Sequence, residues 1–192
     1  MIFQSKTSAD FFEDRYRKKA DPWGFTFKEY EQNRFATIVA ALSGKRYRRA
    51  FEPGCSIGTL TERLAPICDH IDACDFSPTA VDLARQRCAA LPNVHLSCAA
   101  LTGKTPLAGY DLILFSEIGY YFRLGKWRSM VAALATSMDP GATVLASHWL
   151  GHSDDHRIEG DQVHEVLRAD PRLRLDFEQR HEGFRLDRFV RL

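Results

Sequence analysis

Hydrophobic positions recur at two different spacings along the 192 residues, and these spacings predict where helices and strands lie. A polar N-terminal segment predicts a helix capped by Ser8, which residues 21–24 (Asp-Pro-Trp-Gly) interrupt because proline and glycine oppose helix continuation. A second helix is predicted up to Ser43-Gly44. Its apolar residues at helical spacing are Phe35, Ile38, Val39 and Leu42.

From residue 48 onward, short apolar runs alternate with amphipathic segments. The runs predict strands at residues 48–52, 71–75, 94–98, 111–115, 142–149, 173–177 and 184–192. Helices are predicted around residues 60–67, after the capping pair Ser77-Pro78, at residues 127–138 and at residues 161–169. This alternation indicates βαβ units, and the short polar join between the last two strands indicates an antiparallel hairpin at the sheet edge.

The pattern therefore predicts an α/β fold. We expect a single doubly wound, Rossmann-like domain, whose sheet is mostly parallel with an antiparallel edge strand. Residues 1–45 would form an N-terminal helical lid and residues 46–192 the sheet domain, together one structural unit. A chain of 192 residues has room for one such core and little more.

Composition narrows the classes of partner. The 26 Lys+Arg nearly balance the 25 Asp+Glu, so no global field favours nucleic acid or an anionic membrane. The five cysteines form no CxxC pair, which argues against a disulfide framework or a zinc knuckle. Acidic residues occupy the N-terminus where a signal peptide needs an apolar run, and no apolar stretch approaches the roughly 20 residues of a membrane span. We expect a cytoplasmic protein, and neither composition nor motifs indicate an oligomeric state.

The turn after the first sheet strand is the first candidate site, because ligands of such sheets bind at the carboxyl ends of strands. There the chain reads Glu52-x-Gly54-x-Ser56-x-Gly58, with small residues at alternate positions. Small residues let backbone N–H groups approach a ligand, and the following helix points its N-terminal amides at the turn. Taken alone, the pattern also fits a strand-to-helix turn without a ligand.

Asp75 lies at the end of the next predicted strand, 17 positions after Gly58. An acid there can accept hydrogen bonds from both hydroxyls of a ribose. The alternative is a cap for the following helix, but Ser77 already fills that role. A dinucleotide site normally needs GxGxxG, and Glu52 would repel a pyrophosphate. The same acid suits the ammonium group of a methionine moiety, so the motif favours S-adenosyl-L-methionine as cofactor.

These motifs resemble those of class I S-adenosylmethionine-dependent methyltransferases in residues 52–58, Asp75 and the run Tyr110-Asp111-Leu112-Ile113. More narrowly, the chain is similar to the NodS family, nodulation N-methyltransferases that act on lipochitooligosaccharide precursors. The resemblance runs from about residue 21 to residue 141. The stretches that carry it are Asp21-Pro22-Trp23, Thr61-Glu62-Arg63-Leu64-Ala65-Pro66 and Ser116-Glu117-Ile118-Gly119-Tyr120-Tyr121.

The resemblance implies a cofactor site built from several segments. The 52–58 turn would surround the methionine part, Asp75 would take the ribose, and Phe76 would lie against the adenine. The remaining residues that we expect near the cofactor are Trp23, Tyr30, Arg34 and Ser116. Arg34 is a candidate partner for the cofactor carboxylate, although it also fits a solvent-facing helix arginine. Relatives often carry an acid that contacts the adenine amine where this chain has Ala100.

For the transfer itself, we expect Glu117, Tyr120 and His148 to act on the acceptor. Methyl transfer is an in-line displacement in which an amine must attack in its neutral form, so a nearby base helps. Glu117 follows the central strand, and His148 ends the next one. His148, His152 and His156 would share a face if they were helical, which raises the question of a metal. The residues between them oppose a continuous helix, so we expect no metal site.

The sequence therefore predicts a methyltransferase that acts on a small-molecule or glycan acceptor, such as an amine of an amino sugar. An O-methyltransferase of the same fold and a non-catalytic cofactor-binding module stay open as alternatives, as does a small nicotinamide-dependent oxidoreductase. No motif marks a nucleic-acid substrate.

Overall fold

The computed structural model describes residues 8–192 of the chain. In this part, the strands are β1 (Ala50–Pro53), β2 (Ile71–Asp75), β3 (Val94–Cys98), β4 (Leu112–Ser116), β5 (Thr143–Trp149), β6 (Leu173–Arg180) and β7 (Phe184–Arg191). The helices are α1 (Ala9–Lys18), α2 (Glu29–Ala41), α3 (Thr59–Leu64), α4 (Pro78–Arg87), α5 (Leu124–Ser137) and α6 (Gly160–Arg168), with short 3₁₀ turns η1 (Ala65–Ile67) and η2 (Gly119–Tyr121). Each strand and α-helix lies where the hydrophobic pattern predicts it, within a few residues, whereas the 3₁₀ turn η2 was not predicted.

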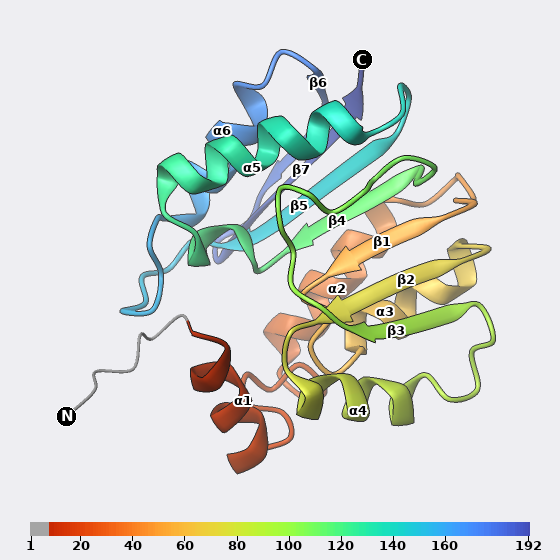
Figure 1. Ribbon diagram of the computed structural model, residues 1–192, viewed down its shortest axis with the longest axis vertical. Coiled ribbons are helices and arrows are strands. Elements are labelled where there is room, and N and C mark those ends of the chain that lie inside the picture. Colours follow the sequence, from red (N-terminus) through yellow and green to blue (C-terminus); the bar gives the residue numbers. More distant parts are fainter. Residues whose placement is uncertain (1–7) are drawn as a thin grey trace. The chain divides into compact units, whose positions relative to one another are not determined.

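The strands form one sheet in the order β3-β2-β1-β4-β5-β7-β6 (Figure 1). The pairs β2/β3, β1/β4 and β4/β5 are parallel, whereas β7 runs antiparallel to both β5 and β6. This order confirms the predicted doubly wound α/β fold, with the hairpin at the edge. Within the hairpin, β7 lies between β5 and β6, and β6 forms the edge of the sheet. Accordingly, β7 is buried along most of its length, whereas β6 alternates and is largely exposed.

The chain divides into two compact units. The first unit comprises the residues up to Arg46 together with Glu52–Ala100, and the second comprises Tyr47–Phe51 and Leu101–Leu192. The division into a helical lid of residues 1–45 and a sheet domain of residues 46–192 stays a prediction. Residues 1–7 of that lid lie outside the described residues.

Local signals set the helix starts in the first unit. Ser8 caps α1 by accepting a hydrogen bond from the Phe11 amide at 3.2 Å. Ser77 caps α4 in the same way, with its Oγ 3.0 Å from the Ala80 amide and a proline at the first helical position. Helix α3 contacts both α2 and α4, and α4 also contacts α1. Helix α4 also packs against β2 and β3 within this unit.

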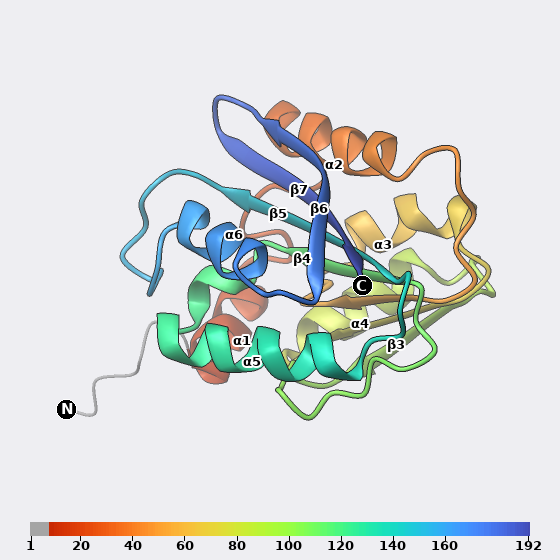
Figure 2. The same cartoon turned by 90° about the horizontal axis from the view of Figure 1, so that it is seen from above.

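The second unit is built around strand β4, whose five residues are all buried. Helix α5 buries an apolar stripe, and its Trp127 indole donates a hydrogen bond to the Val163 carbonyl of α6 at 3.1 Å. Helix α6 lies between α5 and the β6–β7 hairpin and contacts both (Figure 2). Among the described residues, no helix has the length and apolar character needed to cross a membrane.

Candidate functional site

The turn after β1 is closed by backbone hydrogen bonds and needs residues that tolerate positive φ. The amides of Gly54 and Cys55 both donate to the Cys74 carbonyl, at 2.7 and 3.0 Å. Gly58 has φ +77°, and a Cβ at this position would lie 3.1 Å from the Cβ of Ala84 in α4. Glycine therefore permits both the backbone conformation and the close approach of α4.

Glu52 lies at the end of β1 as a buried acid, with 3% of its surface exposed. Its Oε2 accepts a hydrogen bond from the Thr61 hydroxyl at 2.6 Å. Burial raises the pKa of Glu52 to about 7, and the bond from Thr61 only partly offsets this effect. Within residues 8–192, no positively charged side chain pairs with this carboxyl, and a ligand ammonium group would supply the compensating charge.

Thr59, at the start of α3, adds a second sign of a ligand. Its hydroxyl is buried and makes no hydrogen bond within residues 8–192. An unsatisfied buried hydroxyl is unfavourable by about 1–3 kcal/mol, so such groups usually have a partner. Together with Glu52, this hydroxyl fits a polar amino-acid moiety held at the 52–58 turn.

Asp75 ends β2 and faces the same turn. One carboxylate oxygen accepts from the Ser56 amide at 3.1 Å and the other from the Ser77 amide at 2.9 Å. Burial raises the pKa of Asp75, while these amide bonds act in the opposite direction. Each carboxylate oxygen can accept a further hydrogen bond, so the pair of ribose hydroxyls remains compatible with this arrangement.

Helix α1 contributes contacts to this site that the sequence analysis did not identify. The Tyr16 hydroxyl donates to Ser56 Oγ at 2.7 Å, and Tyr16 itself is buried. Glu13 accepts hydrogen bonds from the hydroxyls of Ser77 and Thr79, both at 2.6 Å. Although partial burial acts to raise the pKa of Glu13, these bonds lower it to about 2. The helical spacing of Phe12 and Tyr16 is the signal that could have revealed this inward-facing side of α1.

An aromatic cluster in the first unit includes two of the expected residues. Trp23 packs against the rings of Phe12 and Tyr16, with centroids 6.1 and 5.3 Å apart. Phe12 also meets Phe76 edge to face at 5.5 Å, and Phe76 keeps 37% of its surface exposed. The structure thus brings Trp23 and Phe76 into one cluster and leaves part of the Phe76 side chain able to contact a ligand ring.

Arg34 and Tyr30 of α2 differ in their surroundings. Arg34 is 1% exposed, its Nη2 lies 2.8 Å from Glu31 Oε2, and its guanidinium lies over the Phe35 ring. The solvent-facing alternative for Arg34 is therefore wrong, because the helix turns this side chain toward the interior. Tyr30, in contrast, is exposed.

In the second unit, the structure brings Glu117 and Tyr120 together just after β4. Glu117 Oε2 accepts from the Tyr120 hydroxyl at 2.6 Å, and Oε1 accepts from the Trp149 amide at 2.7 Å. The Glu117 amide donates to the Ser147 carbonyl at 2.9 Å, and the residue adopts a φ of +57°. Ser116, the residue before it, is buried at the end of β4. Two partners thus hold the Glu117 carboxylate, and a third holds its backbone.

His148 lies at the end of β5 and is fully buried. Its Nε2 accepts a hydrogen bond from the Gly119 amide at 3.1 Å, and its Nδ1 lies 3.2 Å from His164 Nε2. Both ring nitrogens are therefore engaged inside the second unit. The expected role of His148 as a base stays a prediction, and these contacts also support a positioning role.

His156 lies in the segment between β5 and α6, which is not helical. Its ring stacks on that of Tyr120 with centroids 3.7 Å apart, and burial lowers its pKa. Within residues 8–192, no group of three or more His, Cys, Asp and Glu side chains could hold a metal ion. The sequence spacing of His156 raised only the question of a metal ligand, whereas its aromatic contact with Tyr120 depends on the tertiary structure.

Comparisons with known proteins agree with this geometry. A family model described as Nodulation protein S (NodS) matches residues 7–145. Nodulation protein S of Sinorhizobium fredii is 30% identical over 127 residues, which are 66% of this chain and 56% of that protein. Nodulation protein S of Bradyrhizobium diazoefficiens is 26% identical over 127 residues, 65% of this chain and 61% of that protein. The matched region therefore spans little more than half the length of these curated relatives.

Solved structures extend the similarity. A putative methyltransferase from Pseudomonas syringae is 34% identical, with a TM-score of 0.74 over 85% of this chain and 100% of that chain. The N-methyltransferase NodS from Bradyrhizobium japonicum, in complex with S-adenosyl-L-homocysteine, has the same fold, with 21% identity and a TM-score of 0.81 over 95% of this chain and 98% of that chain. Since the family model covers well over half of the sequence, the chain belongs to the NodS family.

Proposed function

We propose that this chain is an S-adenosyl-L-methionine-dependent methyltransferase that transfers a methyl group to an amine of an amino sugar or glycan. The observation that carries the proposal is the buried carboxyl of Glu52, whose pKa is raised to about 7 at the end of β1. A buried acid without a paired cation is unfavourable unless a ligand supplies the positive charge. The ammonium group of the methionine moiety meets this requirement, and a pyrophosphate does not.

The other residues of the first unit suit the rest of the same cofactor. Asp75 would accept the ribose hydroxyls, and the exposed part of Phe76 would contact the adenine ring. Gly54, Ser56 and Gly58 keep the turn small enough for the methionine chain to approach the backbone. Trp23, Tyr30, Arg34 and Ser116 complete the proposed cofactor-binding set. The structure of NodS from Bradyrhizobium japonicum, which contains S-adenosyl-L-homocysteine, supports this choice of ligand.

In the second unit, Glu117 is the proposed proton acceptor for the attacking amine. When bound, S-adenosyl-L-methionine supplies an electrophilic methyl group on a sulfonium. The Glu117 carboxylate can accept an additional hydrogen bond on each oxygen while it keeps those from Tyr120 and Trp149. It would thereby orient the amine of the acceptor and take its proton, and Tyr120 would hold the carboxylate in place.

Calorimetry with the full chain tests the cofactor directly. We expect S-adenosyl-L-homocysteine to bind and a reduced nicotinamide nucleotide not to bind. If neither S-adenosyl-L-methionine nor S-adenosyl-L-homocysteine binds, the proposal fails. Binding of the nicotinamide nucleotide alone would favour the oxidoreductase alternative.

A second experiment identifies the acceptor class. Methyl-labelled S-adenosyl-L-methionine is incubated with glucosamine oligomers that carry a free amine and with their fully N-acetylated counterparts. We expect label on the free amines only, located by mass analysis of the product. Label on a hydroxyl would support the O-methyltransferase alternative, and cofactor binding without transfer to any acceptor would support the non-catalytic one.

A further inference from the structure

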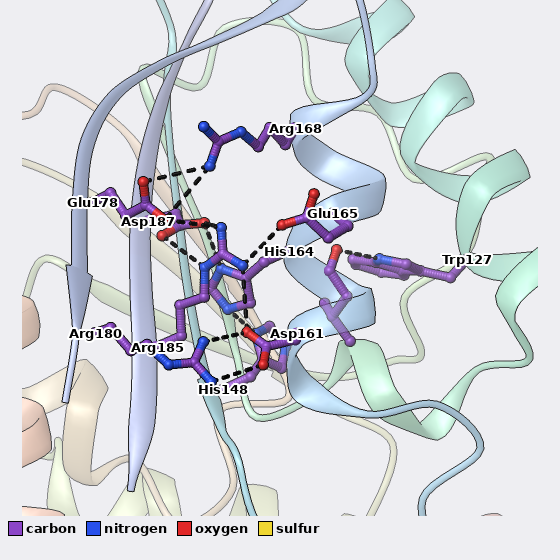
Figure 3. A network of polar contacts seen from close by, with 11 residues as sticks. Trp127, His148, Asp161, His164, Glu165, Arg168, Glu178, Arg180, Arg185 and Asp187 are labelled. Carbon is purple, nitrogen blue, oxygen red and sulfur yellow. Dashed lines mark hydrogen bonds and ion pairs between the residues drawn. The ribbon is translucent and has the colours of Figure 1, made fainter. Parts of the chain in front are cut away.

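A chain of fully buried polar side chains runs through the second unit, behind the segment that carries Glu117. His148 of β5, His164 of α6 and Asp187 of β7 are each 0% exposed. His148 Nδ1 lies 3.2 Å from His164 Nε2, and His164 Nδ1 lies 2.9 Å from Asp187 Oδ2. Figure 3 shows the side chains of α6 directed toward the hairpin strands, where Asp187 and Arg185 meet them.

The geometry determines where the protons of this chain lie. The Gly119 amide can only donate, so the His148 Nε2 that it contacts at 3.1 Å must carry a lone pair. A neutral His148 then has its proton on Nδ1 and donates it to His164 Nε2. His164 in turn keeps its own proton on Nδ1, next to Asp187. The two hydrogen bonds therefore assign one proton to each imidazole ring, on Nδ1 of His148 and on Nδ1 of His164.

The far end of the chain is a carboxylate that is stabilised in its charged form. Arg185 Nη2 lies 2.9 Å from Asp187 Oδ2, and the same guanidinium contacts Glu165 and Glu178 (Figure 3). Burial acts to raise the pKa of Asp187, but the close contact with His164 and the charge of Arg185 hold it below its ordinary value. Asp187 is therefore ionised, and its Oδ2 lies beside Nδ1 of His164.

At the other end of this series, His148 fixes the backbone close to Glu117 through the Gly119 amide. Gly119 begins the 3₁₀ turn that carries Tyr120, and a Cβ at Gly119 would clash with Val163 Cγ1. The Tyr120 carbonyl accepts from the Arg157 amide at 2.7 Å, which holds the other side of the same turn. Because the Tyr120 hydroxyl contacts Glu117, a shift at Gly119 would move the hydroxyl away from the carboxylate.

We propose that His148 is a positioning residue. His164 and Asp187 select its neutral form with the proton on Nδ1. In this form Nε2 accepts a hydrogen bond from the Gly119 amide, which holds Tyr120 against Glu117. The effect on turnover rests on the proposed function. The proton arrangement does not, because it follows from the contacts alone. His164 and Asp187 act through His148 in the same way, as positioning residues remote from the acceptor.

Nuclear magnetic resonance on the ¹⁵N-labelled full chain tests the proton arrangement. At pH 7 we expect the imidazole ¹⁵N shifts and two-bond couplings of His148 and His164 to show protonated Nδ1 and unprotonated Nε2. Signals from an Nε2–H form or from an imidazolium at His148 would overturn the inference. This readout requires no cofactor or acceptor, so it stands whether or not the proposed function fails.

Variants of His148 test the positioning role. His148→Gln keeps an acceptor that can reach the Gly119 amide, whereas His148→Leu removes it. We expect His148→Leu to lower kcat about 10- to 100-fold and to leave the Kd of S-adenosyl-L-homocysteine unchanged within about twofold, with His148→Gln recovering most of the loss. Equal turnover of the two variants would overturn the inference.

Asp187→Asn tests the role of the carboxylate beside His164. It also keeps the proposal testable if His148→Leu fails to fold. Asp176→Asn is its matched control, because Asp176 pairs with Arg188 across the same hairpin and is partly exposed. We expect Asp187→Asn to shift the His148 ring signals and the Gly119 amide signal and to lower kcat, and Asp176→Asn to do neither. Unchanged ring signals in Asp187→Asn would contradict the proposal that Asp187 acts on His148 through His164.

Discussion

Ser56 and Glu117 occupy comparable positions in the two units and are held there in different ways. Among residues 8–192, they are the only non-glycine residues with positive φ, at +52° and +57°. Both follow closely after a buried strand, Ser56 after β1 and Glu117 after β4. The left-handed region is unfavourable by about 1–2 kcal/mol for such residues, and proteins tend to place this strain at functional sites.

The surroundings of the two residues explain the difference. Next to Ser56, the chain has Gly54 and Gly58, and the turn is closed by amides that bond to the neighbouring strand. Next to Glu117, the conformation is held by partners far along the chain, the Ser147 carbonyl and the Trp149 amide. The first strained residue thus depends on local sequence, and the second depends on the packing of β4 against β5.

The acids at the two sites differ in their compensation. Glu52 is buried with the Thr61 hydroxyl as its partner, and its pKa is raised to about 7. Glu117 accepts hydrogen bonds from both a hydroxyl and an amide. We interpret Glu52 as an acid that requires a ligand cation. We interpret Glu117 as a carboxylate whose orientation is fixed by protein hydrogen bonds before any ligand binds.

The largest effect is expected from Glu117→Gln, which removes the proposed proton acceptor and keeps the side-chain shape. Turnover with labelled cofactor should fall by about 10²- to 10⁴-fold, the range for a lost general base. The Kd of S-adenosyl-L-homocysteine should stay within about twofold, because Glu117 acts on the acceptor. Glu182→Gln, in the exposed turn of the hairpin, serves as control. Full turnover in Glu117→Gln would show that Glu117 does not accept the proton.

Asp75→Ala should produce the next largest effect, in the first unit alone. Two hydrogen bonds from ribose to a charged group would be lost, each contributing about 1.5–3 kcal/mol. Calorimetry should therefore show that S-adenosyl-L-homocysteine binds at least about 100-fold more weakly. Asp72→Ala, on the same strand with its carboxylate on His70, is the matched control and should bind normally. Equal affinities in the two variants would remove Asp75 from the cofactor site.

Glu52→Gln should stabilise the ligand-free protein and weaken the cofactor complex. The pKa of Glu52 rises from 4.5 to about 7 on folding, so its ionisation opposes folding increasingly between pH 4.5 and 7 and fully above pH 7. The variant should gain up to about 3 kcal/mol of unfolding free energy at pH 8, because each unit of pKa is worth about 1.4 kcal/mol.

That gain should shrink as the pH falls from 7 to 4.5 and vanish below, where Glu52 is protonated in both states. Denaturant unfolding at several pH values measures it, with Glu62→Gln on the exposed side of α3 as control. A loss of stability at pH 8 in Glu52→Gln would contradict the assignment of Glu52 as an uncompensated acid.

The smallest effect concerns the strain at Ser56. Ser56→Gly relieves the positive φ but removes the hydroxyl that accepts from Tyr16, a hydrogen bond worth about 1 kcal/mol. The net change in unfolding free energy should therefore be below about 1 kcal/mol. In a Tyr16→Phe background the same substitution should be stabilising, since that bond is already absent. Destabilisation in both backgrounds would show that the turn does not depend on relieving strain at Ser56.

The sequence alone was sufficient to predict those features whose physical cause lies within a few neighbouring residues. The capping serines Ser8 and Ser77, the proline at position 78 and the two periodicities act within a few residues, and they placed every element of the sheet and its helices. The small residues after β1 and the acid that ends β2 are local in the same sense. The position and small residues of the 52–58 turn could therefore be predicted from the sequence, and its role in cofactor binding stays a prediction.

Tertiary structure decided what depends on partners far apart in the chain. Neither periodicity nor spacing indicates that β7, and not β6, pairs with β5. They also do not indicate that Arg34 is buried or that Tyr16 contacts Ser56, 40 positions further along the sequence. The same holds for His148, whose character is set by His164 and Asp187 on two other elements. Hydrogen bonds and burial between distant segments exist only once the sheet is assembled. The acids and aromatic residues of both sites were therefore readable from the sequence, and their protonation and orientation were not.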